Sequence, residues 1–245
     1  MRVILRSVLY NILFYLNVLA WLVVAVPTFV LPRRCVIEVA KAWGRSSVWL
    51  LRVVCGVKVE WRGLEKIPPG ALLVASKHQS AWETFALLSL FDDPTFIQKR
   101  ELMWIPIFGW LTWKAGMIPV DRGAGSQALA DLTVHARRAV EENRQIIIFP
   151  EGTRRATGAE PRYKYGVAHL YGEGVAPCLP IALNSGLYWP RRRFLRRPGT
   201  VLVEILDSIA PGVDNDEFFI RLQRDIEAAT TRLVAEGERE LQRLM

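Results

Sequence analysis

A long segment near the start of the chain carries no charged side chain. It extends over residues 7–32, and its stretch Val8–Val26 is almost wholly apolar and aromatic. About 20 such residues are enough to cross the hydrocarbon core of a bilayer. Arg2 and Arg6 precede it, as in a signal peptide, but the run is longer than the apolar region of a signal peptide and no small-residue cleavage site follows it. We therefore expect a helix that associates with a membrane.

A second helix is predicted directly after the first, over Val36–Val54. Its charged residues project within one narrow stripe at helical spacing, while apolar side chains and two tryptophans occupy the rest of its surface. The stripe consists of Glu38, Lys41, Arg45 and Arg52. Such a helix packs on a domain or lies among lipid headgroups. Residues 1–56 are therefore expected to form a two-helix membrane-associating hairpin, which either spans the bilayer or lies on it.

The basic character of the chain indicates anionic partners, since the formal net charge is +8 and the sequence pI is about 9.7. The basic residues lie in no nucleic-acid-binding motif, so nucleic acid is not expected as a partner, and the apolar start favours anionic lipid. If the first helix crosses, the basic residues between Arg33 and Arg52 outnumber Arg2 and Arg6. This places the rest of the chain in the cytoplasm, at the inner membrane. The cluster Arg191–Arg197 fits either a solvated loop or a contact for anionic groups.

After Val57, short apolar runs alternate with helical patterns, which is typical of an α/β fold. We expect a mixed, mostly parallel sheet covered by helices, formed by residues 57–245 as a second unit. The predicted strands are Val57–Trp61, Ala71–Ser76, Thr95–Gln98, Met117–Val120, Ile146–Phe149, Pro177–Leu183 and Val201–Leu206. The predicted helices are Ala81–Leu90, Gly125–Glu142, Lys164–Gly172 and Asn215–Leu244. Ligands of such folds bind beyond the carboxyl ends of the strands.

His78 and Glu83 follow the second predicted strand and have the chemistry of a base and its orienting carboxylate. A neutral imidazole accepts a proton near pH 7, and a carboxylate against its other nitrogen fixes the tautomer. Residues five apart diverge on one regular helix, so the pair can meet only if His78 lies in the turn before the helix. Ser80 and Glu83 also fit a capping box, in which Glu83 only bonds the backbone. Both interpretations remain open from this segment alone.

A second candidate segment ends the strand at Ile146–Phe149. Pro150 stops the strand, and Gly152 allows the backbone to approach a ligand closely. Thr153 and Arg154 then supply a hydroxyl and a planar, permanently charged guanidinium, the groups that hold a phosphate. This segment favours the catalytic interpretation of His78, because Arg154 and His78 would both lie beyond the carboxyl ends of strands, where ligands of such folds bind.

Four motifs, taken together, resemble those of the 1-acylglycerol-3-phosphate acyltransferase family of glycerolipid acyltransferases. The resemblance covers about residues 60–190. In chain order the motifs are His78-x-x-x-x-Glu83, Lys99–Leu102 with Gly116–Arg122, Phe149–Arg154, and the apolar segment Cys178–Leu183. The commoner family pattern has Asp at the position of Glu83. Because Glu carries the same charge on a longer side chain, we expect its orienting role to be kept.

The resemblance implies that residues 57–245 form an acyltransferase catalytic domain. It implies acyl transfer from acyl-CoA or acyl carrier protein to the sn-2 hydroxyl of lysophosphatidic acid, giving phosphatidic acid for phospholipid biosynthesis. His78 would be the general base and Glu83 its orienting partner. The implied phosphate-binding residues are Arg154, Gly152 and Thr153, with Lys99 and Arg122 as helpers and Glu151 supporting the motif. No metal is expected, and no cofactor beyond the acyl donor as co-substrate.

Other interpretations stay open. The acceptor could be a different lysolipid, or His78 could activate water in a lipid hydrolase. The sequence names no oxyanion donors, although backbone amides near the helix start at Ser80 are candidates. The tryptophans are expected mostly in the core, with an acyl tunnel or a membrane-dipping segment as alternatives; these are Trp82, Trp104, Trp110 and Trp113.

Overall fold

The computed structural model describes residues 1–121, 123, 125–174 and 176–244. Among these residues, seven strands form one sheet in the order β1-β7-β6-β2-β5-β3-β4. All neighbouring strands are parallel except β6 and β7. The strands are β1 (Val57–Arg62), β2 (Leu72–Ser76), β3 (Pro94–Lys99), β4 (Ile118–Val120), β5 (Gln145–Ile148), β6 (Cys178–Leu183) and β7 (Gly199–Ile205). The expected mixed, mostly parallel α/β sheet is confirmed.

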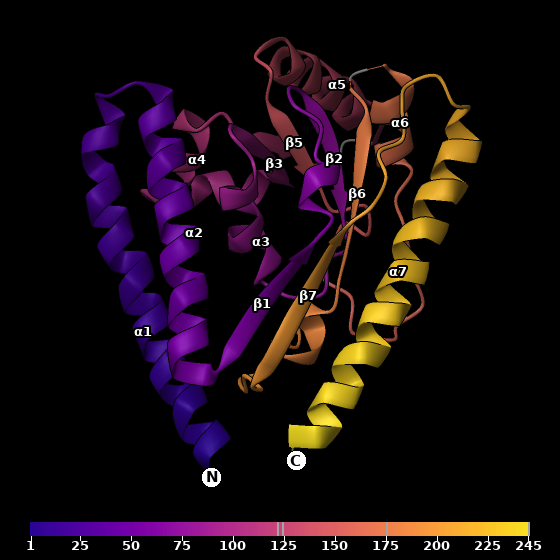
Figure 1. The fold of residues 1–245 in the computed structure, drawn as a ribbon. Helices are drawn as coiled ribbons and strands as arrows, with labels where there is room; N and C mark the ends of the chain where they lie inside the picture. The colour runs from indigo at the N-terminus through magenta and orange to yellow at the C-terminus, as the bar shows by residue number, and fades with distance from the viewer. Residues whose placement is uncertain (122, 124, 175, 245) are drawn as a thin grey trace.

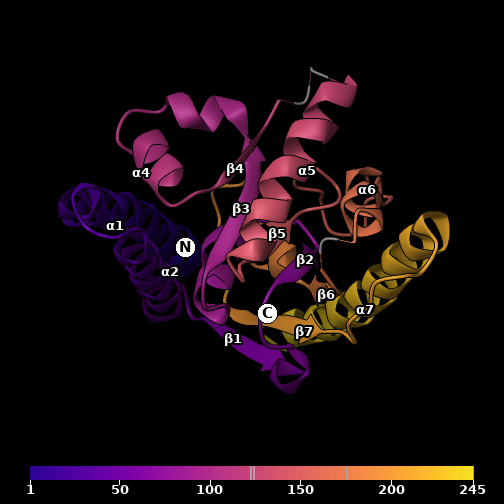
Figure 2. The same cartoon turned by 90° about the horizontal axis from the view of Figure 1, so that it is seen from above.

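Helices cover both faces of the sheet (Figures 1 and 2). One face packs against α1 (Arg2–Ala25), α2 (Arg33–Cys55) and α3 (Glu83–Ala86), and the other against α5 (Gly125–Glu141), α6 (Gly166–Gly172) and α7 (Asn215–Leu244). Because β2 and β6 are buried on both faces, they consist of continuous apolar runs rather than alternating ones. Their burial fixes the positions of the loops at their carboxyl ends.

The predicted elements agree with the observed ones to within one or two residues at most strand ends. The helix expected over Ala81–Leu90 is shorter, since α3 covers only Glu83–Ala86 and a 3₁₀ turn, η3, covers Leu87–Leu90. His78 therefore lies in the turn between β2 and α3, as the pairing with Glu83 requires.

The first two helices, α1 and α2, form a hairpin that packs on one face of the sheet (Figure 1). The helical stretch Arg2–Phe29 is long and apolar enough to cross a membrane, by length and composition. Its outer face leaves large apolar side chains in solvent, among them Leu5, Leu9 and Leu16. Its inner face contributes Tyr10 to the core beneath β7 and β6. The division of the chain at residues 56 and 57 stays a prediction, because this core is shared by both parts.

Lys41 differs from the expected exposed stripe of α2. Its side chain is buried, and its ammonium binds the Glu38 carboxylate at 2.9 Å and the backbone oxygen of Asp92. Glu38, Arg45 and Arg52 are exposed as the spacing predicted. The long lysine stem lets a charge at the edge of the stripe reach a carbonyl of the next layer.

α1 contacts the rest of the protein near both of its ends. Near its start, the backbone amide of Arg196 donates to the Ser7 hydroxyl at 2.9 Å, and Asn11 donates to the carbonyl of Phe194 at 3.3 Å. Beyond its end, Lys114 donates to the carbonyl of Phe29 at 3.0 Å. The helix is therefore fixed alongside the domain over its whole length of about 36 Å.

The core expectation for the tryptophans is correct for Trp82 and wrong for three others. Trp82 is fully buried, whereas Trp104, Trp110 and Trp113 are 72%, 58% and 74% exposed. The exposed three lie on the 3₁₀ turn η4 (Arg100–Trp104) and on α4 (Phe108–Lys114), a short segment with only one buried face. They line no enclosed acyl tunnel, since most of each ring is in solvent.

Candidate active site

The carboxyl ends of β2, β5 and β3 lie side by side at one edge of the sheet, because these strands are parallel and adjacent. This edge brings together the His78 turn, which follows β2, and the arginine loop (residues 150–155), which follows β5. Lys99 is the last residue of β3 and is exposed. Arg122, predicted as a second helper, lies outside the described residues. The expected convergence is confirmed for His78, Lys99 and Arg154 as a common edge.

The His78 imidazole and the Glu83 carboxylate are in direct contact. Nδ1 of His78 lies 2.9 Å from Oε1 of Glu83. An ionised carboxylate only accepts, so Nδ1 carries the proton and Nε2 holds the lone pair that can take another. The carboxylate is fully buried, while the His78 side chain is 12% exposed. The pair therefore has the arrangement of a base with one nitrogen fixed and the other available.

Glu83 also caps the turn, so the contact with His78 and the capping contacts that the sequence suggested are both present. Oε1 accepts from the backbone amides of Gln79 and Ser80, each at 2.7 Å, and the Ser80 hydroxyl accepts from the amide of Trp82 at 3.0 Å. Oε2 accepts from the Ser185 hydroxyl at 2.8 Å. Four donors thus stabilise the negative charge of a carboxylate that solvent does not reach. Its orientation toward His78 is fixed by the fold.

Three of the backbone amides near the start of α3 already donate hydrogen bonds within the turn. Those of Gln79 and Ser80 donate to Glu83, and that of Trp82 donates to the Ser80 hydroxyl. None of these three amides is therefore free to bind an oxyanion. The capping carboxylate takes the donors that a helix start would otherwise offer to a ligand.

Phe149 supports the imidazole from the side of β5. Its ring stacks on the His78 ring with the centroids 4.0 Å apart and the planes at 15°, and Phe96 stacks on its far side at 5.9 Å. Together with Glu83, this stacking restricts the imidazole in the plane and out of it. A ring held in this way keeps Nε2 in one direction.

The arginine loop is joined to the His78 turn by its backbone. The amide of Arg155 donates to the carbonyl of His78 at 2.8 Å, and Gly152 has a φ of +64°, the left-handed region that glycine adopts without strain. Arg154 directly precedes the bonded residue and is half-buried, and Thr153 is exposed. Among the described residues, the Arg154 guanidinium forms no hydrogen bond or ion pair. Arg154 is thus a cation, in a loop bonded to the His78 turn, that remains available to an anion.

Glu151 points inward, away from any phosphate held by the loop. Its carboxylate is fully buried and accepts from the Lys77 ammonium and from the backbone amide of His78, both at 2.9 Å. Burial raises the pKa of the Glu151 carboxyl above its usual value, and the Lys77 ammonium opposes that rise. Glu151 therefore fixes the backbone of His78, and its role in supporting the motif stays a prediction.

Several side chains of the site were not predicted from the sequence. Ser185 follows the carboxyl end of β6 at the same sheet edge, a position that could have indicated it. Lys164 lies beside the arginine loop, since its Cγ would be 3.6 Å from a Cβ on Gly152.

In the part of the chain that the structure describes, no group of three or more His, Cys, Asp or Glu side chains gathers as metal ligands would.

The chain is similar to known acyltransferases. A family model described as acyltransferase matches residues 58–184. A 1-acyl-sn-glycerol-3-phosphate acyltransferase of Pseudomonas aeruginosa is 36% identical over 198 residues, which are 81% of this chain and 77% of that protein. The 1-acyl-sn-glycerol-3-phosphate acyltransferase alpha of Mus musculus is 31% identical over 159 residues, 63% of this chain and 56% of that protein.

A solved structure also has the same fold. The crystal structure of the 1-acyl-sn-glycerophosphate (LPA) acyltransferase PlsC from Thermotoga maritima matches with a TM-score of 0.76 at 21% identity, covering 95% of this chain and 99% of that chain. The family match over residues 58–184 and the similarity to the Pseudomonas aeruginosa enzyme therefore show that the protein is an acyltransferase. The chain belongs to the 1-acyl-sn-glycerol-3-phosphate acyltransferase family.

Proposed function

We propose that this enzyme transfers an acyl group from a thioester donor to the sn-2 hydroxyl of 1-acyl-sn-glycerol 3-phosphate, giving phosphatidic acid in phospholipid biosynthesis. The observation that carries the proposal is the His78–Glu83 contact of 2.9 Å, one hydrogen bond away from a loop that presents Arg154. The names of the relatives in Pseudomonas aeruginosa and Mus musculus support lysophosphatidic acid as the acceptor.

The reaction needs an activated alcohol and a leaving thiol. Nε2 of His78 removes the proton of the acceptor hydroxyl as its oxygen bonds to the thioester carbonyl carbon, a role worth about 10² to 10⁴ in rate. The buried Glu83 carboxylate stabilises the imidazolium that forms. The tetrahedral intermediate then expels the thiolate, and the imidazolium returns its proton to the sulfur. The same imidazole takes up the proton and returns it. Because the acyl group passes directly from the sulfur to the acceptor oxygen, the reaction requires no protein nucleophile.

The acceptor phosphate is held by the arginine loop. Arg154 supplies the guanidinium, Gly152 allows close approach of the backbone and Thr153 supplies a hydroxyl, with Lys99 and Arg122 as further cations. Arg154 is favoured because it is half-buried at the loop that bonds the His78 carbonyl. Holding the phosphate fixes the hydroxyl relative to Nε2, and orientation of this kind lowers a barrier by up to about 7–11 kcal/mol in ideal cases.

The donor is acyl-CoA or acyl carrier protein, used as co-substrate, and the enzyme needs no cofactor or metal for this step. A thioester is reactive enough that base catalysis and orientation suffice. The net charge of +8 favours both donors electrostatically, since CoA and acyl carrier proteins are anionic.

The hairpin holds the enzyme on one face of the inner membrane, with the catalytic domain on the cytoplasmic side. The contacts near both ends of α1 favour attachment without crossing. The two ends of a crossing helix lie on opposite sides of the bilayer, whereas here Arg196 and Lys114 of the same domain bond near both ends. The exposed apolar face of α1 then faces the acyl chains, and the basic surface of the domain faces anionic headgroups.

The direct test is turnover of purified enzyme with defined substrates. Wild-type protein should acylate lysophosphatidic acid faster than lysophosphatidylcholine or lysophosphatidylethanolamine, and His78→Ala should lose at least about 10²-fold of kcat. The variant His135→Ala, on the exposed side of α5, is the matched control and should retain full activity. Full turnover by His78→Ala would refute the mechanism. Preference for another lysolipid would move the proposal to that acceptor, and release of free fatty acid in place of phosphatidic acid would identify a hydrolase.

A further inference from the structure

A buried group of charges links the last helix of the chain to the backbone of the catalytic base. We call it the Lys77 cluster, and it consists of Lys77, Glu151, Tyr163 and Glu227. The Lys77 ammonium donates to Glu151 Oε1 at 2.9 Å and to Glu227 Oε1 at 2.6 Å. The Tyr163 hydroxyl donates to the same Glu227 oxygen at 2.9 Å. Glu227 is on α7, more than forty residues beyond the segment that the family model matches.

Burial makes this cluster consequential for the site. The exposed fractions of the side chains are 4% for Lys77, 0% for Glu151 and 23% for Glu227. A buried ammonium between two carboxylates is held by both, and losing one leaves it free to move toward the other. Burial also raises the pKa of the Tyr163 hydroxyl, which keeps it protonated as a donor to Glu227.

The cluster connects to the base through one further bond. Glu151 uses its second oxygen, Oε2, to accept from the backbone amide of His78 at 2.9 Å. The carbonyl of His78 is in turn bonded by the amide of Arg155. Both polar groups of the His78 backbone are therefore fixed, one by the arginine loop and one by Glu151. The position of Glu151 depends on Lys77, and Lys77 is held from α7 by Glu227.

We propose that Glu227 is a positioning residue for acyl transfer. It touches no substrate. Glu227 holds the Lys77 ammonium, Lys77 holds Glu151, and Glu151 fixes the His78 backbone. Nε2 of His78 is thereby kept in position relative to the arginine loop. This inference rests on the proposed function, because it assigns to α7 a part in placing the same base. It extends the catalytic unit beyond the four sequence motifs to α7.

The first test is the kinetics of Glu227→Gln, which keeps the shape and removes the charge. We expect kcat to fall about tenfold, since a misplacement of 1 Å costs up to about 100-fold, while KM for both substrates stays within about twofold. Tyr163→Phe frees the same carboxylate from its other donor and should cause a smaller fall. Because both changes act through one oxygen, the double variant should be no slower than Glu227→Gln alone.

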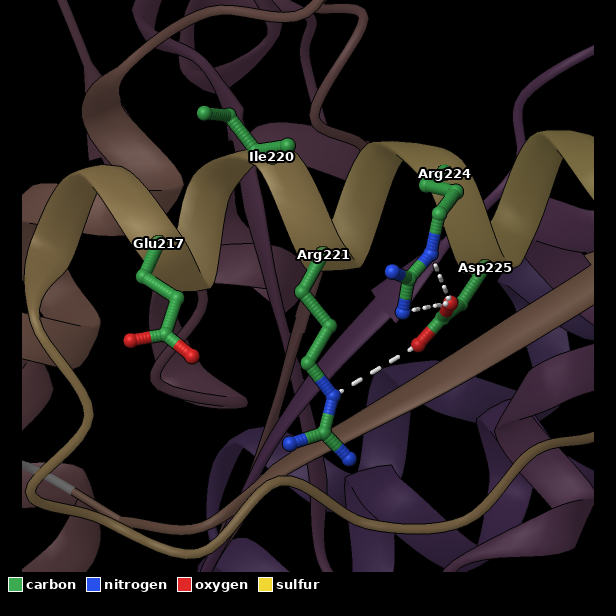
Figure 3. Close-up of a pocket in the computed structure, with 5 residues that line it drawn as sticks. All are labelled: Glu217, Ile220, Arg221, Arg224 and Asp225. Atoms are coloured by element: carbon green, nitrogen blue, oxygen red, sulfur yellow. Dashed lines mark hydrogen bonds and ion pairs between the residues drawn. The ribbon is translucent and has the colours of Figure 1, made fainter.

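The matched control lies on another face of the same helix. Glu217 is exposed near the start of α7, close to Ile220, Arg221, Arg224 and Asp225 (Figure 3). In that group the Asp225 carboxylate pairs with Arg221 at 3.6 Å and with Arg224 at 2.9 Å. Figure 3 shows no hydrogen bond or ion pair between Glu217 and the other four residues. Glu217→Gln should therefore keep wild-type kcat and the wild-type melting temperature.

A second readout reports on the backbone of the base itself. The chain has three histidines, so ¹⁵N-histidine labelling gives three backbone amide signals in a micelle spectrum. His135→Gln and His169→Gln assign the other two. In Glu227→Gln the amide signal of His78 should shift, because its carboxylate acceptor moves, and the signals of His135 and His169 should not. A merely structural role of Glu227 would lower the melting temperature without this selective shift.

The outcomes separate this inference from the proposed function. If Glu227→Gln keeps wild-type kcat, or if its loss is matched by a fall in melting temperature with an unmoved His78 amide, the inference is overturned. The proposed function stands in that case as long as His78→Ala is inactive. If His78→Ala retains full turnover, the proposed function fails and this inference fails with it.

Discussion

Replacing Glu83 by Gln isolates the charge of the orienting residue from its hydrogen bonds. The amide oxygen of Gln can still accept from Gln79, Ser80 and Nδ1 of His78, and its amide nitrogen can donate to the Ser185 hydroxyl. The tautomer of His78 is therefore kept. Only the attraction between the carboxylate and the imidazolium is lost.

The size of that loss follows from the contact distance. Two unit charges 2.9 Å apart attract by about 6 kcal/mol at an effective dielectric constant of about 20. About half of the proton charge has moved to the imidazole in the transition state, so about 3 kcal/mol of stabilisation is lost. This corresponds to about 10²-fold in kcat. Glu83→Asp keeps the charge and should lose less.

The assay is transfer of radiolabelled acyl groups to lysophosphatidic acid in mixed micelles, with the melting temperature measured on the same preparations. Glu141→Gln, an exposed carboxylate on α5, is the control for a generic loss of one charge. A Glu83→Gln enzyme with wild-type kcat would refute the electrostatic role. So would a Glu83→Asp enzyme slower than Glu83→Gln, because shape would then matter more than charge.

Four further changes have defined outcomes. Arg154→Ala should raise KM for the phosphate-bearing acceptor about tenfold or more and leave KM for the donor nearly unchanged; equal effects on both would exclude phosphate binding. Lys77→Met should lower the free energy of unfolding in urea by about 3–5 kcal/mol at neutral pH, because it leaves the buried Glu151 carboxylate without its ammonium. Burial raises the pKa of the Glu151 carboxyl, so this loss should shrink as the pH falls and Glu151 becomes protonated. Gly44→Ala should destabilise by about 1–3 kcal/mol in the same unfolding experiment, since the added Cβ would collide with a backbone oxygen of α3. Leu9→Glu with Leu16→Glu should abolish flotation with anionic vesicles at an unchanged melting temperature, because both side chains are exposed.

Most of the fold was predictable because its signals are local. The apolar runs of β2, β5 and β6 are strands buried on both faces, and continuous apolar sequence is what such strands require. His78 and Arg154 were predictable as neighbours because they follow parallel strands, whose carboxyl ends share an edge. The capping role and the orienting role of Glu83 looked like alternatives, yet one oxygen performs both.

The rest depends on contacts between distant segments. Nothing in the sequence around Glu227 distinguishes it from the other acidic residues of α7, and only the packing of that helix brings it to Lys77. Lys41 was assigned to an exposed stripe because helical spacing does not report which carbonyl a long side chain can reach. Trp104 on η4 and the two tryptophans of α4 were wrongly predicted as core residues. Composition shows that a segment is apolar, but it does not show which of its faces the rest of the protein covers.

The aromatic side chains on the inner face of α1 have a consequence for handling the enzyme. Tyr10 and Phe14 pack against Trp189, and Phe14 also packs against Phe85, two residues after the orienting carboxylate. Deleting α1 to make a detergent-free enzyme would therefore also remove the aromatic ring that packs against Phe85 on the helix that carries Glu83. The membrane-associating helix and the catalytic domain share one core, so a more soluble enzyme should be sought by replacing the exposed apolar side chains of α1 with polar ones.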